Sequence, residues 1–298
     1  MSGILVTGKT GQVGWELERR LAQLGDVVAV DRHQMNLTDP DSIRRAIRRM
    51  RPAIIVNAAG YTAVDKAEAE PDLSFQVNGI APGVMAEEAR RIDALLVHYS
   101  TDYVYDGAKG TPYVEGDTPN PLNIYGKSKL EGEQAIAAAG CAHLILRTSW
   151  LYSSRGTNFV LTMLKLARER KELAVVIDQI GSPTWARMLA DSTATILGDP
   201  EHARQNSGIY HLSAQGYPSR FDFAEKIIEL ARRLSPNGAD WASVKPTTTE
   251  NYPLPAMRPL HAATSKDKIK NVFDIAIPDW VQQLKACLTE LLGENGGR

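Results

Sequence analysis

The sequence predicts an α/β protein in which a doubly wound parallel β-sheet is followed by a smaller, irregular domain. Three observations support this fold class. Short runs of Val, Ile and Leu alternate with amphipathic stretches in the first half of the chain, as in successive βαβ units. A glycine-rich turn follows the first of these runs. From about residue 150 the alternation weakens, and four of the five tryptophans lie in this second half.

The apolar runs are predicted to be strands that helices cover on both faces, because such strands are apolar on both sides. They are residues 4–7, 27–31, 53–57, 94–100 and 143–148. Helices are predicted between them, at residues 12–24, 41–50 and 125–139. Asp39-Pro40-Asp41 contains the residue types that start a helix, which indicates where the second helix begins.

The second half contains four further predicted helices, at residues 158–170, 187–197, 219–233 and 278–292. Between them, residues 235–259 contain five prolines and are expected to be irregular. We therefore divide the chain into a sheet-based domain, residues 1–150, and a second domain, residues 151–298, that completes a substrate pocket. The boundary is approximate, because helices after residue 150 can pack back on the sheet.

Charge and composition exclude several classes of function. The 298 residues include 34 Lys and Arg against 35 Asp and Glu, so no general attraction to nucleic acid is expected. The apolar runs are too short for a membrane helix. The N-terminus lacks the basic region of a signal peptide, and Cys141 and Cys287 match no disulfide or zinc spacing. These features predict a cytoplasmic protein that binds neither nucleic acid nor a membrane.

Gly8, Gly11 and Gly14 form a G-x-x-G-x-x-G pattern directly after the first predicted strand. Here the chain must turn tightly and start a helix whose free N–H groups can bind a pyrophosphate. Asp31 ends the second predicted strand, 20 residues after Gly11, where a carboxylate can accept hydrogen bonds from an adenosine ribose. Together these features predict a Rossmann-like sheet that binds NAD(P).

The sequence leaves the choice of coenzyme open. The Asp31 carboxylate favours NADH, whose ribose keeps its 2′-hydroxyl, whereas the guanidinium of the adjacent Arg32 can accept the 2′-phosphate of NADPH. Asn36 and Leu37 follow, and the apolar Leu37 is placed to line an adenine pocket.

A second phosphate-binding motif overlaps the glycine loop. Residues 3–10 match the G-x-x-x-x-G-K-[ST] pattern of nucleotide triphosphatases. In a true phosphate loop the four middle residues follow a strand, whereas here they are the predicted strand itself. The triphosphatase interpretation is therefore rejected.

Tyr125 and Lys129 are four residues apart, so they lie on one face of a predicted helix. A phenol is a poor acid or base near neutral pH unless its pKa is lowered, and a neighbouring ammonium group can lower it. Structural helices also contain this pair by chance, so the pair alone does not define an enzyme.

Several motifs occur in one order along the chain. They are the glycine loop, Asp31, Asn57-Ala58-Ala59-Gly60, Ser100-Thr101-Asp102, and Tyr125 with Lys129. In this order they resemble the extended short-chain dehydrogenase/reductase family, which acts largely on nucleotide sugars. Further segments at residues 62–68, 98–105, 147–152 and 178–184 extend the resemblance over most of the first 190 residues. Within the family, these segments are most similar to those of reductases that act on 4-keto sugars.

The resemblance implies that a nicotinamide coenzyme, NADPH or NADH, reduces the C4 ketone of dTDP-4-dehydro-L-rhamnose to dTDP-L-rhamnose. It implies that Tyr125 protonates the developing alkoxide, that Lys129 holds the nicotinamide ribose and lowers the pKa of Tyr125, and that Thr101 hydrogen-bonds the carbonyl oxygen. The residues expected to bind the sugar are Thr101, Asp102, Tyr125 and Trp150. The residues expected to bind the coenzyme are Gly8, Gly11, Gln12, Val13, Asp31, Asn36, Leu37, Gly60, Tyr61, Thr62, Tyr99, Tyr125 and Lys129.

Other residues favour one activity within the family or differ from the family pattern. Tyr103 stands where nucleotide-sugar 4,6-dehydratases have Glu, which favours reduction over elimination. Arg258 is a candidate contact for the diphosphate, but Ala262-Ala263 replace the Asn-Ser that the family has nearby. Relatives can bind Mg²⁺ through glutamates at a dimer interface, so a homodimer is an expectation. Glu16 is present here, but Arg187 would repel the metal, so no metal site is assigned.

Two alternatives to this activity stay open. Some relatives are non-catalytic regulatory subunits of the methionine-adenosyltransferase type, and they can keep the fold and even the Tyr-x-x-x-Lys pair. The other alternative is a reductase that acts on a different nucleotide 4-keto sugar.

Overall fold

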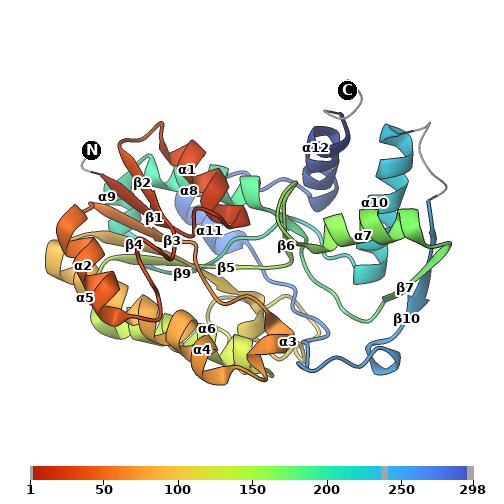
Figure 1. Ribbon diagram of the computed structural model, residues 1–298, viewed down its shortest axis with the longest axis horizontal. Coiled ribbons are helices and arrows are strands. Elements are labelled where there is room, and N and C mark those ends of the chain that lie inside the picture. Colours follow the sequence, from red (N-terminus) through yellow and green to blue (C-terminus); the bar gives the residue numbers. More distant parts are fainter. Residues whose placement is uncertain (1–2, 236–240, 294–298) are drawn as a thin grey trace.

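The computed structural model describes residues 3–235 and 241–293. It shows a sheet layer with helices on both faces and a second lobe at one side of it (Figure 1). The main sheet has six parallel strands in the order β2-β1-β3-β4-β5-β9. These strands are β1 (Ile4–Thr7), β2 (Val27–Val30), β3 (Ile54–Asn57), β4 (Leu95–Thr101), β5 (His143–Thr148) and β9 (Gly208–His211).

The strand order confirms the predicted doubly wound α/β fold. From β1 the chain adds β2 on one side and β3 on the other, so the winding direction reverses between β1 and β3. In open sheets of this kind, ligands bind beyond the carboxyl ends of the strands at this switch point.

Helices cover both faces of the sheet because alternate strand residues point to opposite sides. Val6 of β1 packs in one core with Leu17, whereas the next position back, Leu5, packs in the other core with Ile47. All four side chains are almost fully buried, and each such burial contributes roughly 1.5–3 kcal/mol. The first face carries α1 (Gln12–Leu21) and α8 (Ala186–Leu197); the second carries α2 (Pro40–Met50), α5 (Ala81–Ile92) and α6 (Ile124–Ala139) (Figure 1).

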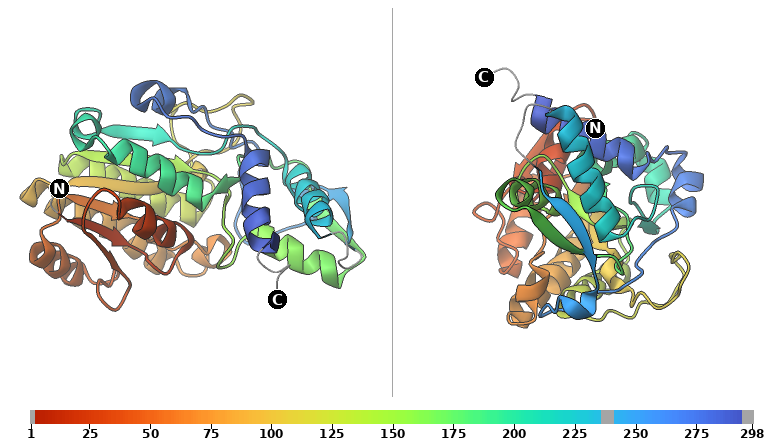
Figure 2. Two further views of the ribbon diagram at one scale, coloured as in Figure 1. Left: turned by 90° about the horizontal axis from the view of Figure 1, so that it is seen from above. Right: turned by 90° about the vertical axis from the view of Figure 1, so that its right-hand side faces the viewer.

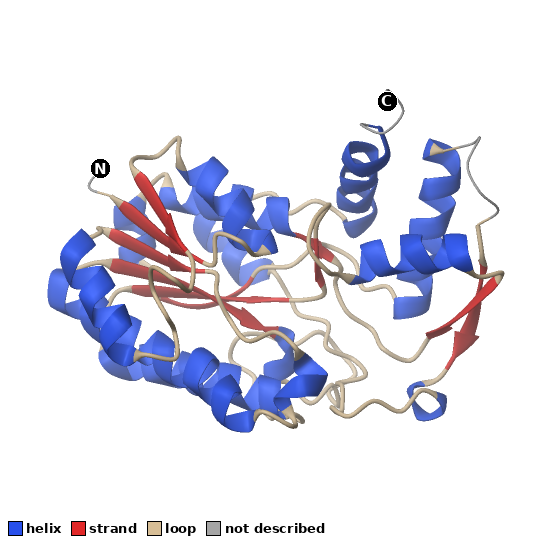
Figure 3. Ribbon diagram, in the orientation of Figure 1, coloured by secondary structure: helices blue, strands red, loops and turns tan. Residues whose placement is uncertain are grey.

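The second lobe stands beside the sheet layer in Figures 2 and 3. It contains α7 (Phe159–Glu169), α10 (Arg220–Leu234), α12 (Trp280–Gly293) and the parallel strands β7 (Glu172–Val176) and β10 (Ser243–Thr247). Phe223 joins its three helices: its ring centre lies 5.4 Å from that of Phe159 and 5.9 Å from that of Trp280. The lobe is therefore held together by an aromatic core.

The remaining elements are short. They are α3 (Val64–Ala67), α4 (Pro71–Phe75), a π-helical turn (Gln76–Ile80), 3₁₀ turns at Asp102–Val104 and Thr249–Asn251, β6 (Leu151–Tyr152), β8 (Thr184–Trp185), α9 (Pro200–Gln205) and α11 (Asp267–Phe273). In the described part of the chain, no helix combines the length and the apolar character that crossing a membrane requires.

The five predicted strands are confirmed to within one residue at each end, and the seven predicted helices to within three. Asp39 caps α2 by accepting a hydrogen bond from the Asp41 N–H (2.9 Å), as its position predicted. The expectation that residues 235–259 are irregular is wrong at residues 243–247, which form β10. Pro246 fits there because β10 is an edge strand of a two-stranded sheet. Residues 236–240 lie outside the described part.

Segments from both sides of residue 150 build the sheet layer. The late strand β9 extends the sheet beyond β5, and α8 packs against α1. In contrast, α7, α10 and α12 form the second lobe. The chain thus returns to the sheet after it first leaves it.

Candidate active site

Two adjoining cavities lie at the carboxyl ends of β1, β3 and β4. The larger cavity, of about 1120 Å³, is lined by the glycine loop, by the end of β2 and by residues 58–62. The smaller cavity, of about 360 Å³, is lined by the ends of β4 and β5, by α6 and by residues of the second lobe. Gln12, Val13 and residues 58–60 line both cavities, so the two form one continuous site.

Every residue that the sequence analysis assigned to the coenzyme or the sugar lines one of these cavities, whereas Arg258, the candidate diphosphate contact, lines neither. Around the larger cavity are Gly8, Gly11, Gln12, Val13, Asp31, Asn36, Leu37, Gly60, Tyr61 and Thr62. Around the smaller cavity are Tyr99, Thr101, Asp102, Tyr125, Lys129 and Trp150. The fold therefore brings these distant segments together, while their chemical roles remain predictions.

The glycine loop is shaped by close backbone contact. A Cβ atom at Gly14 would lie 2.1 Å from the Gly8 carbonyl oxygen, so only glycine fits at this position. Gly11 is the N-cap of α1 and supplies no side chain to bind the first N–H groups of the helix. An anionic ligand in the larger cavity can therefore accept these hydrogen bonds.

Asp31 directly follows the carboxyl end of β2, and its carboxylate is ionised. A hydrogen bond from the His33 N–H (2.9 Å) lowers the pKa of Asp31, and Lys9, with its Nζ 3.2 Å away, lowers it further against the opposing effect of burial. The adjacent Arg32 is exposed and also lines the larger cavity. Both groups are thus placed to contact an adenosine ribose.

Tyr125 lies in the first turn of α6, whose start is fixed by Asn123 accepting a hydrogen bond from the Gly126 N–H (2.8 Å). In contrast to the lowering expected from Lys129, the pKa of Tyr125 is raised: burial raises it, and a hydrogen bond with Thr101 opposes this increase. The phenol therefore keeps its proton at neutral pH, which is the state that a general acid requires.

Lys129 contacts His98, a buried histidine of β4. The Lys129 Nζ donates to the Tyr99 carbonyl oxygen (2.6 Å) and lies 3.0 Å from the His98 Nε2. On the other side of the ring, the His98 Nδ1 lies 3.0 Å from the Asn57 amide nitrogen. Burial lowers the pKa of Lys129 to about 8 and that of His98 below its usual range. A neutral imidazole therefore helps to orient Lys129.

Asp102 is buried in the smaller cavity with its two carboxylate oxygens occupied. They accept hydrogen bonds from the hydroxyls of Ser149 (2.7 Å) and Thr101 (3.1 Å). Burial raises the pKa of Asp102 to about 6, and these two hydrogen bonds limit the increase. Sequence reasoning did not find Ser149, because only the pairing of β4 with β5 brings it to Asp102.

Trp150 has a backbone conformation that is unfavourable for a bulky residue, with φ of 43°. Its indole lies over Gly181, where an added Cβ atom would come within 2.5 Å of a ring carbon. The strained conformation and this close contact fix the indole at the wall of the smaller cavity.

Replacing Gly181 with Ala is expected to displace the Trp150 indole and to raise the KM for the sugar substrate, leaving the affinity for the coenzyme unchanged. The matched control is Gly116→Ala, because a Cβ atom there meets nothing within 4 Å. Steady-state kinetics and coenzyme titration measure both effects. An unchanged KM in Gly181→Ala would show that Trp150 does not contact the sugar.

Arg258, the candidate diphosphate contact, forms an ion pair with Asp65 instead of lining the smaller cavity. Its guanidinium donates to both carboxylate oxygens of Asp65 (3.0 and 2.7 Å) and to the Ala256 carbonyl oxygen (2.7 Å). A different arginine, Arg220 at the start of α10, lines the smaller cavity. No sequence signal placed Arg220 there, because α10 reaches the site only through the fold of the second lobe.

The glutamates that could hold Mg²⁺ are bound to Arg187. Its guanidinium donates to Glu16 (3.1 and 3.2 Å) and to Glu290 (2.5 and 3.1 Å), joining α1, α8 and α12. Both carboxylates are thus already paired with one guanidinium, whose positive charge lies where a metal would have to sit, so these residues do not fit a divalent cation. No group of three or more His, Cys, Asp or Glu side chains within residues 3–235 and 241–293 is arranged to hold a metal.

Removing divalent cations with EDTA is therefore expected to leave the free energy of unfolding unchanged. Arg187→Gln is expected to lower it by about 1–3 kcal/mol, because the Glu16 carboxylate, only 2% exposed, loses its partner. Arg233→Gln, which breaks an exposed ion pair with Glu229, is the control and should change it by less than about 1 kcal/mol. Urea denaturation measures all three. Destabilisation by EDTA would contradict this account.

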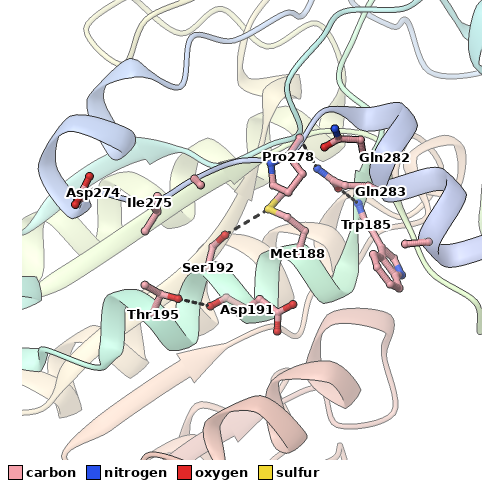
Figure 4. Close-up of a pocket in the computed structure, with 12 residues that line it drawn as sticks. Trp185, Met188, Asp191, Ser192, Thr195, Asp274, Ile275, Pro278, Gln282 and Gln283 are labelled. Atoms are coloured by element: carbon pink, nitrogen blue, oxygen red, sulfur yellow. Dashed lines mark hydrogen bonds between the residues drawn. The ribbon is translucent and has the colours of Figure 1, made fainter.

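A third cavity, of about 560 Å³, lies between α8, α12 and residues 274–278 (Figure 4). Met188 and Ser192 of α8 line it, with the Ser192 hydroxyl 3.4 Å from the Met188 sulfur. It shares no lining residue with the other two cavities. It therefore lies apart from the candidate active site.

A parallel doubly wound sheet, a glycine loop at its first helix and a Tyr-x-x-x-Lys pair facing the same cavity define a Rossmann-type protein of the short-chain dehydrogenase/reductase class. A family model described as the RmlD substrate binding domain matches residues 1–292, and the chain belongs to this family.

Known proteins resemble the chain over nearly its whole length. It is 45% identical over 297 residues to the dTDP-4-dehydrorhamnose reductase of Burkholderia thailandensis, covering 98% of this chain and 99% of that protein. It is 43% identical over 293 residues to the Escherichia coli protein of the same name, covering 97% of each. The Bacillus anthracis reductase, solved in complex with NADP, superposes with a TM-score of 0.88 at 35% identity, covering 97% of this chain and 99% of that one.

Proposed function

We propose that this protein reduces the C4 ketone of dTDP-4-dehydro-β-L-rhamnose to dTDP-β-L-rhamnose with NADPH or NADH, a step in making cell-surface polysaccharide. The observation that carries the proposal is the convergence of Tyr125, Thr101 and Lys129 in a cavity that opens into the one lined by the glycine loop. The names of the relatives at 45% and 43% identity support the identity of the sugar.

The protein's own groups act on the oxygen of the ketone. The bound coenzyme supplies a hydride to C4. Tyr125 donates its proton to the C4 oxygen, and the Thr101 hydroxyl, which points at Asp102 here, can rotate to donate to the same oxygen. Both donors stabilise charge that develops only in the transition state, which is the condition for raising the turnover rate. Lys129 holds the nicotinamide ribose.

The two parts of the chain divide this work. Residues 1–150 supply the glycine loop, Asp31 and the Tyr–Lys pair, so we assign coenzyme binding to them. Residues 151–298 close the sugar pocket, since Phe159 and Arg220 of the second lobe line the smaller cavity. We further propose a cytoplasmic homodimer; light scattering measures the mass in solution, and cell fractionation the location.

The direct test supplies the purified protein with the dTDP-4-keto sugar and follows oxidation of NADPH and of NADH by absorbance. Oxidation coupled to formation of dTDP-L-rhamnose supports the proposal. No oxidation with either coenzyme would overturn it in favour of the regulatory-subunit alternative. Faster turnover of another nucleotide 4-keto sugar would instead identify a different substrate.

Arg32→Ala is expected to weaken NADPH binding while leaving NADH binding nearly unchanged, because a guanidinium contact to the 2′-phosphate exists only with NADPH. The loss should be roughly tenfold, as for one exposed charge-assisted hydrogen bond. Fluorescence titration with both coenzymes measures it, and Arg51→Ala, which is exposed and lines neither cavity, is the control. Equal affinities before and after the change would assign Arg32 no role.

A further inference from the structure

Arg220 is held in a fixed place at the start of α10. The preceding residue, Ser219, forms a capping box with Asp222, in which each side chain bonds the backbone N–H of the other. The Arg220 N–H itself donates to the Gln179 carbonyl oxygen (3.0 Å). The backbone of Arg220 is thus tied on both sides, and its side chain extends from the second lobe to the smaller cavity.

The Arg220 guanidinium rests on aromatic rings. Its central carbon lies 3.6 Å from the centre of the Trp150 ring and 5.1 Å from that of Phe159. Stacking of this kind orients a guanidinium without using its N–H donors. The side chain is therefore pre-organised, with a hydrogen bond to the Tyr103 phenol and further N–H donors left for a ligand.

No carboxylate neutralises this guanidinium. Among the described residues, Arg220 forms no ion pair within 4.0 Å, and its hydrogen-bond partner is the Tyr103 phenol. The nearby carboxylate, Asp102, is already bonded to two hydroxyls. Arg258, in contrast, is paired with Asp65.

The charged residues that line the smaller cavity are Asp102, Lys129 and Arg220. Lys129 is directed to His98 and to the Tyr99 carbonyl oxygen, deep beside Tyr125. This leaves Arg220 as the cation at the second-lobe side of the cavity. A partly buried guanidinium without a counter-ion matches a phosphate, which offers oxygens in the geometry of its planar fork.

We propose that Arg220 binds the diphosphate of the nucleotide-sugar substrate and selects for nucleoside diphosphates in this pocket. The proposal rests on the proposed function, because it takes a nucleotide sugar as the substrate. It transfers to Arg220 the contact that sequence reasoning considered for Arg258. The sugar then lies between Arg220 and Tyr125, against Trp150.

The test compares wild-type protein with Arg220→Met, which keeps the stacking bulk and removes the charge. Affinities are measured for dTDP and for thymidine, which has no phosphate, alongside KM, kcat and coenzyme affinity. Arg220→Met should lose roughly 10- to 150-fold in dTDP affinity, the value for a charged hydrogen bond. The KM should rise by a similar factor, with thymidine and coenzyme affinities unchanged and kcat within about threefold.

The matched control is Arg19→Met. Arg19 also stacks on a tryptophan, with its central carbon 3.4 Å from the Trp15 ring centre, but lines neither cavity. It should bind dTDP as the wild type does. If Arg220→Met does not fold, Arg220→Gln is judged by the same measurements.

Two results would overturn the proposal. One is dTDP affinity in the Arg220 variant equal to that of the wild type. The other is an equal loss for dTDP and thymidine, which would show that Arg220 only supports Trp150 and Tyr103. Failure of the wild type to reduce the dTDP-4-keto sugar would be a different result, since it would reject the proposed reaction while the dTDP titration still reports on Arg220.

Discussion

Tyr125→Phe is expected to lower kcat by about 10²- to 10⁴-fold, the usual contribution of a positioned general acid. The phenol is buried in the smaller cavity and retains its proton, because burial raises its pKa. Removing one oxygen leaves the ring, its edge-on contact with Tyr103 (5.8 Å between centres) and the larger cavity in place. Coenzyme affinity should therefore change little. Single-turnover kinetics and coenzyme titration separate the two effects.

The control is Tyr252→Phe, which removes the same atom from an exposed tyrosine outside both cavities. It should keep the wild-type kcat. If Tyr125→Phe also turned over at the wild-type rate, another group would have to deliver the proton, and the assignment of Tyr125 would be wrong.

Arg147→Leu is expected to lower the free energy of unfolding by about 3–5 kcal/mol, because it leaves a buried carboxylate without its counter-ion. The side chains of Arg147 and Glu133 are 2% and 1% exposed, with 2.5 Å between their nearest atoms. Arg147 also donates to the Tyr105 hydroxyl (2.6 Å), and Glu133 accepts from Ser100 (2.5 Å). Urea denaturation measures the loss.

The double variant Arg147→Leu with Glu133→Leu separates the pair from its neighbours. It should recover part of the stability, since removing both charges abolishes the unpaired carboxylate. A single variant as stable as the wild type would show that water reaches Glu133. Activity should fall with stability, because Glu133 lies one helical turn after Lys129 in α6 and Arg147 pairs in β5 with Ser100, next to Thr101.

Most elements of the sheet layer could be predicted because their signals are local. Each of the first five strands contains at least three consecutive apolar residues, and Asp39 marks the start of α2. β9 was not predicted: its four residues include a glycine and a histidine, and their strand character depends on pairing with β5, more than 60 residues earlier. The region of α5 was not assigned either, because Pro82 is usually a helix breaker and is tolerated here in the first turn.

The candidate active site shows the same difference between local signals, which the sequence carries, and long-range contacts, which it does not. The glycine loop and the Tyr125–Lys129 pair depend on spacing within one turn or one helix, so the sequence alone located them and the class of protein they belong to. Spacing carries no information about which distant side chains meet. The packing of the second lobe brings Arg220 to Trp150. The packing of α1, α8 and α12 brings Glu16 and Glu290 to Arg187, and burial in β4 places a neutral His98 against Lys129. The sequence alone located the groups that we expect to do the chemistry, because their spacing is local. Only the tertiary structure decided which charged side chains form ion pairs and left Arg220 without one, because ion pairing depends on long-range packing.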